Sequence, residues 1–334
     1  MPNNEMNFYS FKAPFRIPIK TPLIELEQRE ILVVEWVNRD GQSYFGECNA
    51  FTTDWYHFET IASVKDVLSQ WFPKCKHAEL TNEVEALNLL EDLNDFPNAR
   101  SVMSMIFYQM FNELEPITID YGATINQQME QYFKQYDQKI PSRIKLKWHN
   151  NIQRDINYLE EHYPDVHRVI DANGTIEAKD IPLLNTFNTK NFIYIEQPFK
   201  NIESYKAHRS SLNLPIFIDE SATSLEHIKQ FQHVGIIDGV VIKPSRVGGI
   251  DKAIEMINYC KAHHLKYVIG GMYEFGLSSY FTAMLAQDSD YPSDITPNDY
   301  YFTDDIVVEG STLQQNKIKY SIPQVNQSKL KKTE

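Results

Sequence analysis

The chain has 334 residues, 42% of them hydrophobic, and a formal net charge of −13. It is longer than most single domains, which favours one barrel with a smaller domain attached to it. The acidic balance, with no Lys- or Arg-rich block before residues 329–332, argues against a protein that binds the phosphate backbone of nucleic acids.

The sequence also bears on the compartment of the protein. Cys48, Cys75 and Cys260 are far apart and show no paired spacing, which argues against a zinc motif or a disulfide framework and is typical of a reducing compartment. No apolar run approaches the about 20 residues that a spanning helix needs, and residues 1–5 lack the pattern of a signal peptide. We therefore expect no membrane insertion and a cytoplasmic location.

Residues 1–115 are expected to form a small α+β domain. Three antiparallel strands are predicted, over residues 6–19, 31–37 and 43–47. Asp40-Gly41 lies between the last two and is a strong hairpin signal, whereas residues 20–29 are predicted to form a mobile loop. Apolar periodicity of the helical type then predicts three helices, over residues 58–71, 82–93 and 99–114.

The stretch after Pro116 repeats one architecture at a nearly constant interval. Short apolar runs typical of β-strands each end in a charged residue, and helix-like segments separate them. The charged residues follow one another at intervals of 24, 25, 23 and 24 residues: Lys147, Asp171, Glu196, Asp219 and Lys243. Strand–helix units joined by right-handed crossovers give parallel strands, and closure of such a sheet gives a β/α barrel. Residues 117–125 are predicted to be its first strand and 266–271 its seventh.

The carboxyl ends of all strands of a β/α barrel share one rim, so the five charged residues are expected to meet in one site. Each alone is weak evidence, because a charge after an apolar run is more often a turn or capping residue. Lys145 and Lys147 by themselves are typical of the solvent-exposed face of a strand, because residues two apart share one face. Only the joint spacing favours a functional cluster. Glu220 is an alternative to its neighbour Asp219, which we prefer because it continues the inward-facing register of Phe217.

Three carboxylates with no His or Cys beside them form a set of hard oxygen ligands, which suits Mg²⁺, with Mn²⁺ as a substitute, rather than zinc. The expected ligands are Asp171, Glu196 and Asp219. A metal bound to a substrate carboxylate stabilises the anion that forms when the neighbouring carbon loses a proton. Lys147 is the expected base, because Lys145 and the metal lower its pKa from about 10.4. Lys243, on the sixth strand, is expected to face Lys147 across the barrel mouth.

These residues stand in motifs that resemble, in order and spacing, the muconate-lactonising branch of the enolase superfamily. The motifs are Lys145-Leu-Lys147, Asp171-Ala-Asn173, Glu196-Gln-Pro198, Asp219-Glu-Ser221 and Ile242-Lys-Pro-Ser-Arg-Val-Gly-Gly249. Within that branch, a second set of motifs is most similar to the o-succinylbenzoate synthase / N-succinylamino acid racemase family. This set comprises Gly46-Glu-Cys48, Trp55-Tyr56, Glu59-Thr60 and Gly270-Gly-Met272 with Glu274. The likeness covers essentially the whole chain.

The resemblance implies an enolase-like α/β fold. Residues 116–298 would form a (β/α)7β TIM-like barrel and residues 1–115 an α+β N-terminal capping domain. Residues 299–334 would return to the capping domain as a C-terminal segment. A small-molecule carboxylate is the implied partner, and the fold is compatible with a homo-oligomer.

The resemblance also implies a reaction. Lys147 would remove the proton α to the carboxylate of 2-succinyl-6-hydroxy-2,4-cyclohexadiene-1-carboxylate and return it to the departing hydroxide. The products would be o-succinylbenzoate, on the route to menaquinone, and water. Lys243 would steady the anion from the opposite face, and Lys145 would tune Lys147 and touch the carboxylate. The implied substrate contacts are Asn173, Gly271 and Met272.

Three alternatives stay open at this point. An N-acylamino acid racemase would use Lys147 and Lys243 as bases on opposite faces of one carbon. A Schiff-base aldolase would use Lys243 as a nucleophile toward a carbonyl. An inactive barrel would keep the fold without the chemistry. Phe275 stands where family members commonly carry a small hydroxyl residue, so the substrate is less firmly implied than the type of reaction.

Overall fold

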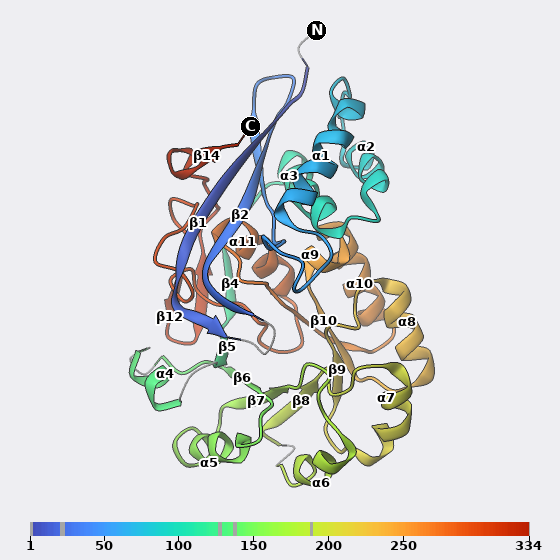
Figure 1. Cartoon of the computed structure of the whole chain (residues 1–334), viewed down its shortest axis with the longest axis vertical. Helices are drawn as coiled ribbons and strands as arrows, with labels where there is room; N and C mark the ends of the chain where they lie inside the picture. The colour runs from blue at the N-terminus through green and yellow to red at the C-terminus, as the bar shows by residue number, and fades with distance from the viewer. Residues whose placement is uncertain (1–2, 21–23, 126–128, 136–138, 188–189, 334) are drawn as a thin grey trace.

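The computed structural model describes residues 3–20, 24–125, 129–135, 139–187 and 190–333. An antiparallel sheet with three helices, formed by the N-terminal part, covers one end of a curved parallel sheet formed by the middle of the chain (Figure 1). One buried apolar cluster lies within the N-terminal layer, and a larger one contains residues of both layers, such as Phe11 and Ile195. The contact between the two layers places the N-terminal part over the carboxyl ends of the parallel strands.

The antiparallel sheet has the strand order β14-β1-β2-β3. In it, β1 (Glu5–Lys20) and β2 (Glu25–Val37) form a long hairpin, and β3 (Ser43–Glu47) pairs with β2. The prediction of a loop over residues 20–29 is wrong for residues 25–29, because Lys20 pairs with Glu25 and Ile19 with Leu26 in the antiparallel ladder. Residues 21–23 of the predicted loop lie outside the described residues. The polar run that suggested a loop belongs to a strand whose end is largely exposed, and backbone pairing does not depend on apolar side chains.

The three helices of this part are α1 (Ile61–Cys75), α2 (Glu83–Leu89), which a short 3₁₀ turn extends to Leu93, and α3 (Pro97–Phe111). They confirm the predicted helices to within a few residues. Thr60 caps α1, since its side chain accepts from the backbone N–H of Ser63 at 3.2 Å while the Ser63 hydroxyl accepts from Thr60 N at 2.8 Å. The helices pack on the sheet through a cluster centred on Trp36, Trp71 and Phe107.

Seven parallel strands follow one another in chain order across the second sheet. They are β5 (Gly122–Ile125), β6 (Arg143–Lys147), β7 (His167–Asp171), β8 (Phe192–Glu196), β9 (Ile216–Ile218), β10 (Gly239–Ile242) and β11 (Lys266–Ile269). The register pairs Lys147 with Asp171 and Asp171 with Glu196. These three predicted rim charges therefore lie side by side at the same level of the sheet, whereas Asp219 lies two residues beyond Phe217, the partner of Glu196.

Residues 290–294 take the position of an eighth strand. Asp294 N donates to Ile269 O of β11 at 3.0 Å, and a Cβ on Gly122 of β5 would lie 2.4 Å from Ser293 O, so this segment closely approaches both edge strands. The predicted fold class, an α/β barrel with an N-terminal α+β domain, is confirmed. One detail differs, because residues 117–125 do not form one barrel strand. Its first half is β4 (Ile117–Asp120), which pairs with β13 outside the barrel.

The helices that follow the barrel strands cover the outside of the sheet (Figure 1). They are α4 (Met129–Gln135), α5 (Ile152–His162), α6 (Ile181–Leu184), α7 (Ile202–His208), α8 (Leu225–Val234), α10 (Ile250–Ala262) and α11 (Gly276–Ala286). The short helix α9 (Pro244–Val247) instead follows β10 at the rim of the barrel and packs against α3 of the N-terminal part. Local sequence fixes several of their ends. Ser224 caps the start of α8, and Gly235, with φ of 70°, ends it in the left-handed conformation that glycine adopts without strain.

The last part of the chain contacts both layers. β12 (Ser311–Gln314) and β13 (Lys317–Tyr320) form a sheet with β4, and β14 (Lys331–Lys332) pairs with β1. The predicted domain limits, 1–115, 116–298 and 299–334, stay a prediction. No helix in the described part of the chain is both long and apolar enough to cross a bilayer.

Candidate active site

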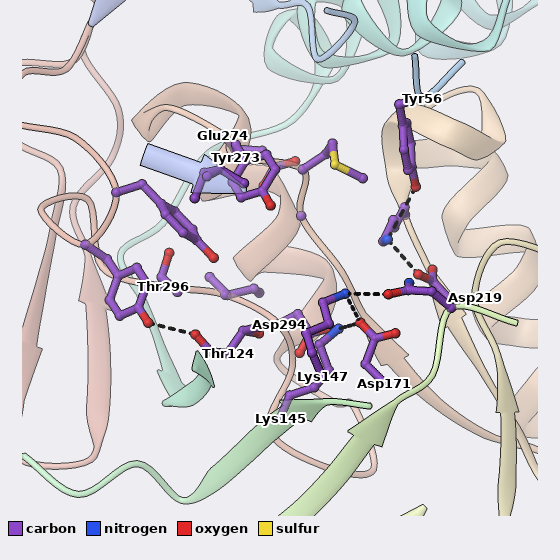
Figure 2. A pocket seen from close by; sticks show the side chains of 18 of the residues that line it. Tyr56, Thr124, Lys145, Lys147, Asp171, Asp219, Tyr273, Glu274, Asp294 and Thr296 are labelled. Atoms are coloured by element: carbon purple, nitrogen blue, oxygen red, sulfur yellow. Dashed lines mark hydrogen bonds and ion pairs between the residues drawn. The ribbon is translucent and has the colours of Figure 1, made fainter. Parts of the chain in front are cut away.

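A cavity of about 990 Å³ lies where the N-terminal layer meets the carboxyl ends of the parallel strands (Figure 2). Its floor carries the lysines and acidic residues of the barrel rim. The end of β1 and the loop after β3, with Trp55 and Tyr56, form part of the wall above them. Trp148, Tyr300 and Tyr301 add aromatic surface from the barrel side. A volume of this size suits a small organic molecule.

On one side of the floor, Lys147 ends β6 beside Asp171. Its ammonium contacts Asp171 Oδ2 and donates to Asn173 Oδ1 at 3.0 Å. Asn173 has φ of 45° and also donates to Glu220 at 2.7 Å, so a left-handed backbone turn aims its side chain at the lysine. Burial disfavours the charged form of Lys147, but the Asp171 carboxylate outweighs it and raises the pKa of the lysine. This is opposite to the lowered pKa expected from the sequence, because Asp171, which that expectation assigns to the metal, contacts the lysine instead.

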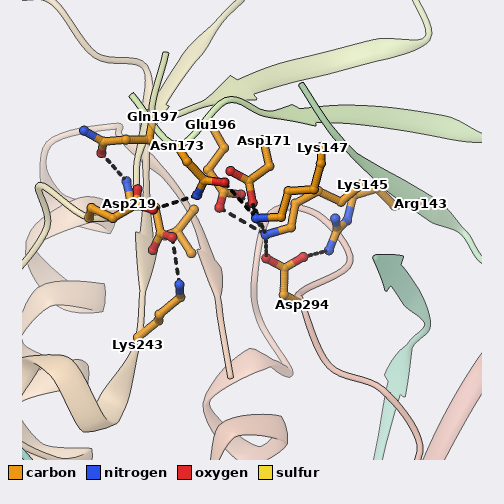
Figure 3. A network of polar contacts seen from close by, with 12 residues as sticks. Arg143, Lys145, Lys147, Asp171, Asn173, Glu196, Gln197, Asp219, Lys243 and Asp294 are labelled. Atoms are coloured by element: carbon orange, nitrogen blue, oxygen red, sulfur yellow. Dashed lines mark hydrogen bonds and ion pairs between the residues drawn. The ribbon is translucent and has the colours of Figure 1, made fainter. Parts of the chain in front are cut away.

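In the middle of the floor, Lys145 lies deeper and is almost fully buried. Its ammonium donates to both oxygens of Glu196, at 3.0 and 3.3 Å, and lies 3.4 Å from Asp171 Oδ2. It also contacts Asp294, which pairs with Arg143 (Figure 3). Burial raises the pKa of Glu196 well above its usual range despite the contact with Lys145. Glu196 is completely buried and does not itself line the cavity.

On the opposite side, Lys243 follows β10 and pairs with Asp219. The ammonium lies 2.7 Å from Asp219 Oδ2, and Arg246 donates to Asp219 Oδ1 at 2.7 Å. Burial alone would raise the pKa of Asp219, but the two cations hold it well below its usual range. Gly270 lies directly under Lys243, since a Cβ there would be 3.0 Å from Lys243 Cε. Three strands, β7 to β9, separate Lys243 from Lys147 around the rim.

The loop after β3 is held over this floor by Arg29 of β2. The guanidinium donates to the carbonyls of Asn49 and Ala50 at 2.7 and 2.8 Å and lies 4.1 Å from the centre of the Phe51 ring. It also donates to Tyr273 O at 3.4 Å, on the barrel side. Arg29 thus ties the loop that carries Trp55 and Tyr56 to the segment after β11.

Comparison with known proteins identifies the family that has this arrangement. A family model described as enolase C-terminal domain-like matches residues 126–321, more than half of the chain. The chain belongs to the enolase superfamily. A crystal structure of an enolase-superfamily member from Listeria innocua superposes with a TM-score of 0.86 at 22% identity, covering 100% of this chain and 98% of that one.

Curated relatives place the chain more narrowly within the superfamily. It is 25% identical over 341 residues to an o-succinylbenzoate synthase of Bacillus subtilis, covering 95% of this chain and 91% of the relative. It is 22% identical to an N-succinylamino acid racemase of Thermus thermophilus, covering 89% and 86%. These relatives confirm the resemblance to the o-succinylbenzoate synthase / N-succinylamino acid racemase family that the sequence motifs indicate.

The three predicted metal ligands, Asp171, Glu196 and Asp219, each form an ion pair within the chain. Within the described residues, no three acidic, His or Cys side chains are already gathered around one point that could hold a metal. Each of the three carboxylates contacts a lysine ammonium instead. The donor chemistry nevertheless fits, because Asp171, Glu196 and Asp219 end or follow three consecutive strands and offer only oxygen. Asp171 Oδ1 is also buried without a hydrogen-bond partner, which marks an oxygen free to accept a cation.

Most predicted site residues share the cavity. Glu196 is the exception, and the residues that line the cavity are Lys145, Lys147, Asp171, Asn173, Asp219, Lys243, Gly271 and Met272. Asp294 and Arg246 are the contacts that the sequence analysis missed. The spacing could have indicated Asp294, because it lies 24 residues after Gly270, near the end of the seventh predicted strand, and this matches the interval between the other strand ends. In the structure Gly270 and Asp294 are neighbours in a parallel bridge. Arg246 lies inside a motif already noted, but its contact with Asp219 depends on the turn at α9.

Proposed function

We propose that this enolase-superfamily enzyme is an o-succinylbenzoate synthase, a carbon–oxygen lyase of menaquinone biosynthesis that works in the cytoplasm. It would dehydrate 2-succinyl-6-hydroxy-2,4-cyclohexadiene-1-carboxylate to o-succinylbenzoate and water. One observation carries the proposal: Lys147 and Lys243 enter a single cavity from opposite sides of a buried acidic cluster. A flat ring bound between two amines can lose a proton on one face while the other face meets a positive charge.

The proposed metal is Mg²⁺, with Mn²⁺ as a substitute, held by Asp171, Glu196 and Asp219. When bound, it would neutralise negative charge that develops on the substrate carboxylate. The positions of these acids on neighbouring strands, and the unpartnered Asp171 Oδ1, support the assignment. Metal binding requires the lysine ammoniums to release these carboxylates. Each displaced ammonium then needs another partner within the site.

In the proposed reaction Lys147 takes the proton from the carbon next to the carboxylate. The electron pair left behind expels the hydroxide from the neighbouring ring position, and Lys147 returns its proton to that hydroxide as water leaves. Base and leaving group are on the same face, so one amine can perform both transfers. Lys147 is the more exposed of the lysines on β6, with 44% of its side chain accessible against 7% for Lys145.

Lys243 is proposed to remain an ammonium throughout the dehydration. In the pairing that the structure shows, burial works against the charge, but Asp219 and the nearby Tyr56 raise the pKa of Lys243 above its usual value. Tyr56, whose hydroxyl lies 3.5 Å from the ammonium, is not a proposed metal ligand and would stay beside the lysine when Asp219 turns to the metal. An ammonium held against the face of a delocalised anion stabilises it electrostatically. Asn173 and the backbone of Gly271 and Met272, which line the cavity, are proposed to contact the substrate.

Racemisation of N-succinylamino acids is the second candidate. It is favoured by the placement of two amines on opposite sides of one site, which is what inversion at a carbon requires. In the dehydration Lys243 holds its proton, whereas in racemisation it must give one up or take one. The two reactions therefore differ in the role of Lys243, whereas Lys147 acts as a base in both.

Two parallel assays test the proposal. The purified chain with Mg²⁺ is given the cyclohexadiene carboxylate, and o-succinylbenzoate is measured. Separately, N-succinylamino acids are incubated in D₂O and α-deuterium is followed in both enantiomers. Dehydration with a higher kcat/KM than racemisation supports the synthase. Efficient deuterium exchange without dehydration would establish the racemase instead. Activity that survives EDTA together with trapping of Lys243 by borohydride would favour a Schiff-base aldolase.

A further inference from the structure

Strand β6 points three cations into the barrel, because alternate residues of a strand share one face. They form a column: Arg143 at the bottom, Lys145 in the middle and Lys147 at the rim. Asp294, from the segment in the eighth-strand position, contacts the lower two at once. Its Oδ1 accepts from Arg143 and its Oδ2 from Lys145 (Figure 3). The acid is 9% exposed in its side chain and lies on the wall of the cavity.

The backbone holds Asp294 firmly in this place. Its N–H donates to Ile269 O at 3.0 Å, and its carbonyl accepts from Gly271 N at 3.4 Å. Arg143 adds a second tie, since its Nε donates to Pro292 O at 2.8 Å. The Nη2 of Arg143 donates to Asp294 Oδ1, so two of its nitrogens bond this segment and none bonds the acids above it.

The partners of Lys145 fall into two groups. Glu196 and Asp171, at 3.0 and 3.4 Å from the ammonium, are both proposed metal ligands. Asp294 is the third carboxylate in contact, and it lies on the side of Lys145 that faces Arg143. A divalent cation and an ammonium compete for the same carboxylate oxygens and repel each other at short range. Occupation of Glu196 by a metal therefore leaves Asp294 as the carboxylate that can keep Lys145 paired.

We propose that Asp294 is a positioning residue that retains the Lys145 ammonium when a divalent metal takes Glu196 and Asp171. This inference rests on the proposed function. Arg143 holds the acid in place, and the acid draws Lys145 downward, away from the metal ligands. Without Asp294, Lys145 would turn fully to Glu196 and compete with the metal for it. The carboxylate would thus act on metal binding through Lys145, without touching the metal or the substrate.

Calorimetric titration of Mg²⁺ and of Mn²⁺ into metal-stripped protein tests this. Asp294→Asn keeps the shape of the side chain and removes its charge, and we expect it to weaken metal binding about 10-fold, as loss of an outer partner of a metal ligand does. In a Lys145→Met background, where no ammonium competes, the same change should weaken binding less than about threefold. Equal losses in the two backgrounds, or unchanged affinity of Asp294→Asn alone, would overturn the inference.

The control is Asp251→Asn. Asp251 also pairs with a buried arginine, Arg100, at 2.7 Å, but it lies outside the cavity. Its metal affinity should equal that of the parent chain, which separates the loss of a buried ion pair from the specific role of Asp294. If the parent chain itself binds neither metal, the proposed function fails. If the parent chain binds metal but Asp294→Asn weakens binding equally with and without Lys145, only the present inference fails.

A crystal structure of the parent chain with Mn²⁺ gives an answer that needs no variant to fold. The inference predicts the Lys145 ammonium within about 3.2 Å of Asp294 and beyond hydrogen-bond distance of Glu196. A Lys145 that has left Asp294, or that still donates to Glu196 beside the bound metal, would overturn it.

Discussion

The ammonium nitrogen of Lys243 lies 2.7 Å from Asp219 Oδ2, and on the other side of the floor Lys147 contacts Asp171 in the same way. Each proposed catalytic amine is thus paired with a proposed metal ligand. A metal that engages Asp171 and Asp219 removes a counter-ion from each lysine. The proposed site therefore couples metal binding to the state of both amines.

Lys147→Ala should lower kcat for dehydration by about 10²- to 10⁴-fold, because it removes the group that carries the proton. The free energy of unfolding should change little, since the side chain is partly exposed. Lys266→Ala is the matched control, because Lys266 pairs with Asp290 at the opposite end of a barrel strand. Near-normal turnover of the Lys147 variant, measured by o-succinylbenzoate formation, would remove Lys147 from the mechanism.

Asp219→Asn should raise the Mg²⁺ concentration for half-maximal activity by about tenfold or more, because an amide is a poorer ligand than a carboxylate for a hard cation. It also leaves Lys243 and Arg246 without their shared acid. Metal titration of activity measures the effect, with Asp251→Asn as the control. An unchanged metal requirement would mean that Asp219 is not a ligand.

Arg29→Met should loosen the loop above the cavity. The change leaves the buried carbonyls of Asn49 and Ala50 without donors, which costs about 2 to 4 kcal/mol of unfolding free energy. Because this loop carries Trp55 and Tyr56 of the cavity wall, we expect KM to rise more than kcat falls. Urea denaturation and steady-state kinetics report the two effects, and the exposed Arg154→Met serves as the control. A pure loss of kcat would contradict the proposed role of the loop.

Glu274 gives a prediction for pH. Burial raises its pKa from 4.5 to about 7, although Ser278 and Thr282 donate hydrogen bonds to it. Between these values the folded chain holds a proton that the unfolded chain has lost, so this contribution to the unfolding free energy falls as pH rises, by up to about 1 kcal/mol per pH unit. Glu274→Gln cannot titrate, and denaturation curves should show a shallower fall between about pH 5 and 7. A steeper fall of the unfolding free energy in Glu274→Gln than in the parent chain would contradict a raised pKa of Glu274.

Much of the barrel could be predicted because its strands end in charges at a regular interval. Lys147, Asp171 and Glu196 pair in register, and this follows from equal spacing in a parallel sheet. The helices α1 and α3 also follow from apolar periodicity. These features depend on residues that are near one another in the chain or repeat at a fixed interval.

What could not be predicted depends on pairing between distant segments. β4 leaves the barrel because β13, nearly 200 residues later, supplies its partner. The start of β2 pairs despite its polar side chains, and Asp294 reaches Lys145 only after the sheet has closed. The ion pairs of Asp171, Glu196 and Asp219 with lysines could not be predicted either. They form because a buried charge is stable only beside a counter-ion, and burial depends on how the floor of the cavity packs.

The most direct test is dehydration of 2-succinyl-6-hydroxy-2,4-cyclohexadiene-1-carboxylate by chain stripped of metal with EDTA, before and after Mg²⁺ is restored. We expect no turnover of the stripped chain above the Lys147→Ala background, and full recovery of o-succinylbenzoate formation when Mg²⁺ is added in excess of EDTA. Equal turnover with and without metal, or no dehydration under either condition from a folded chain, would contradict this expectation.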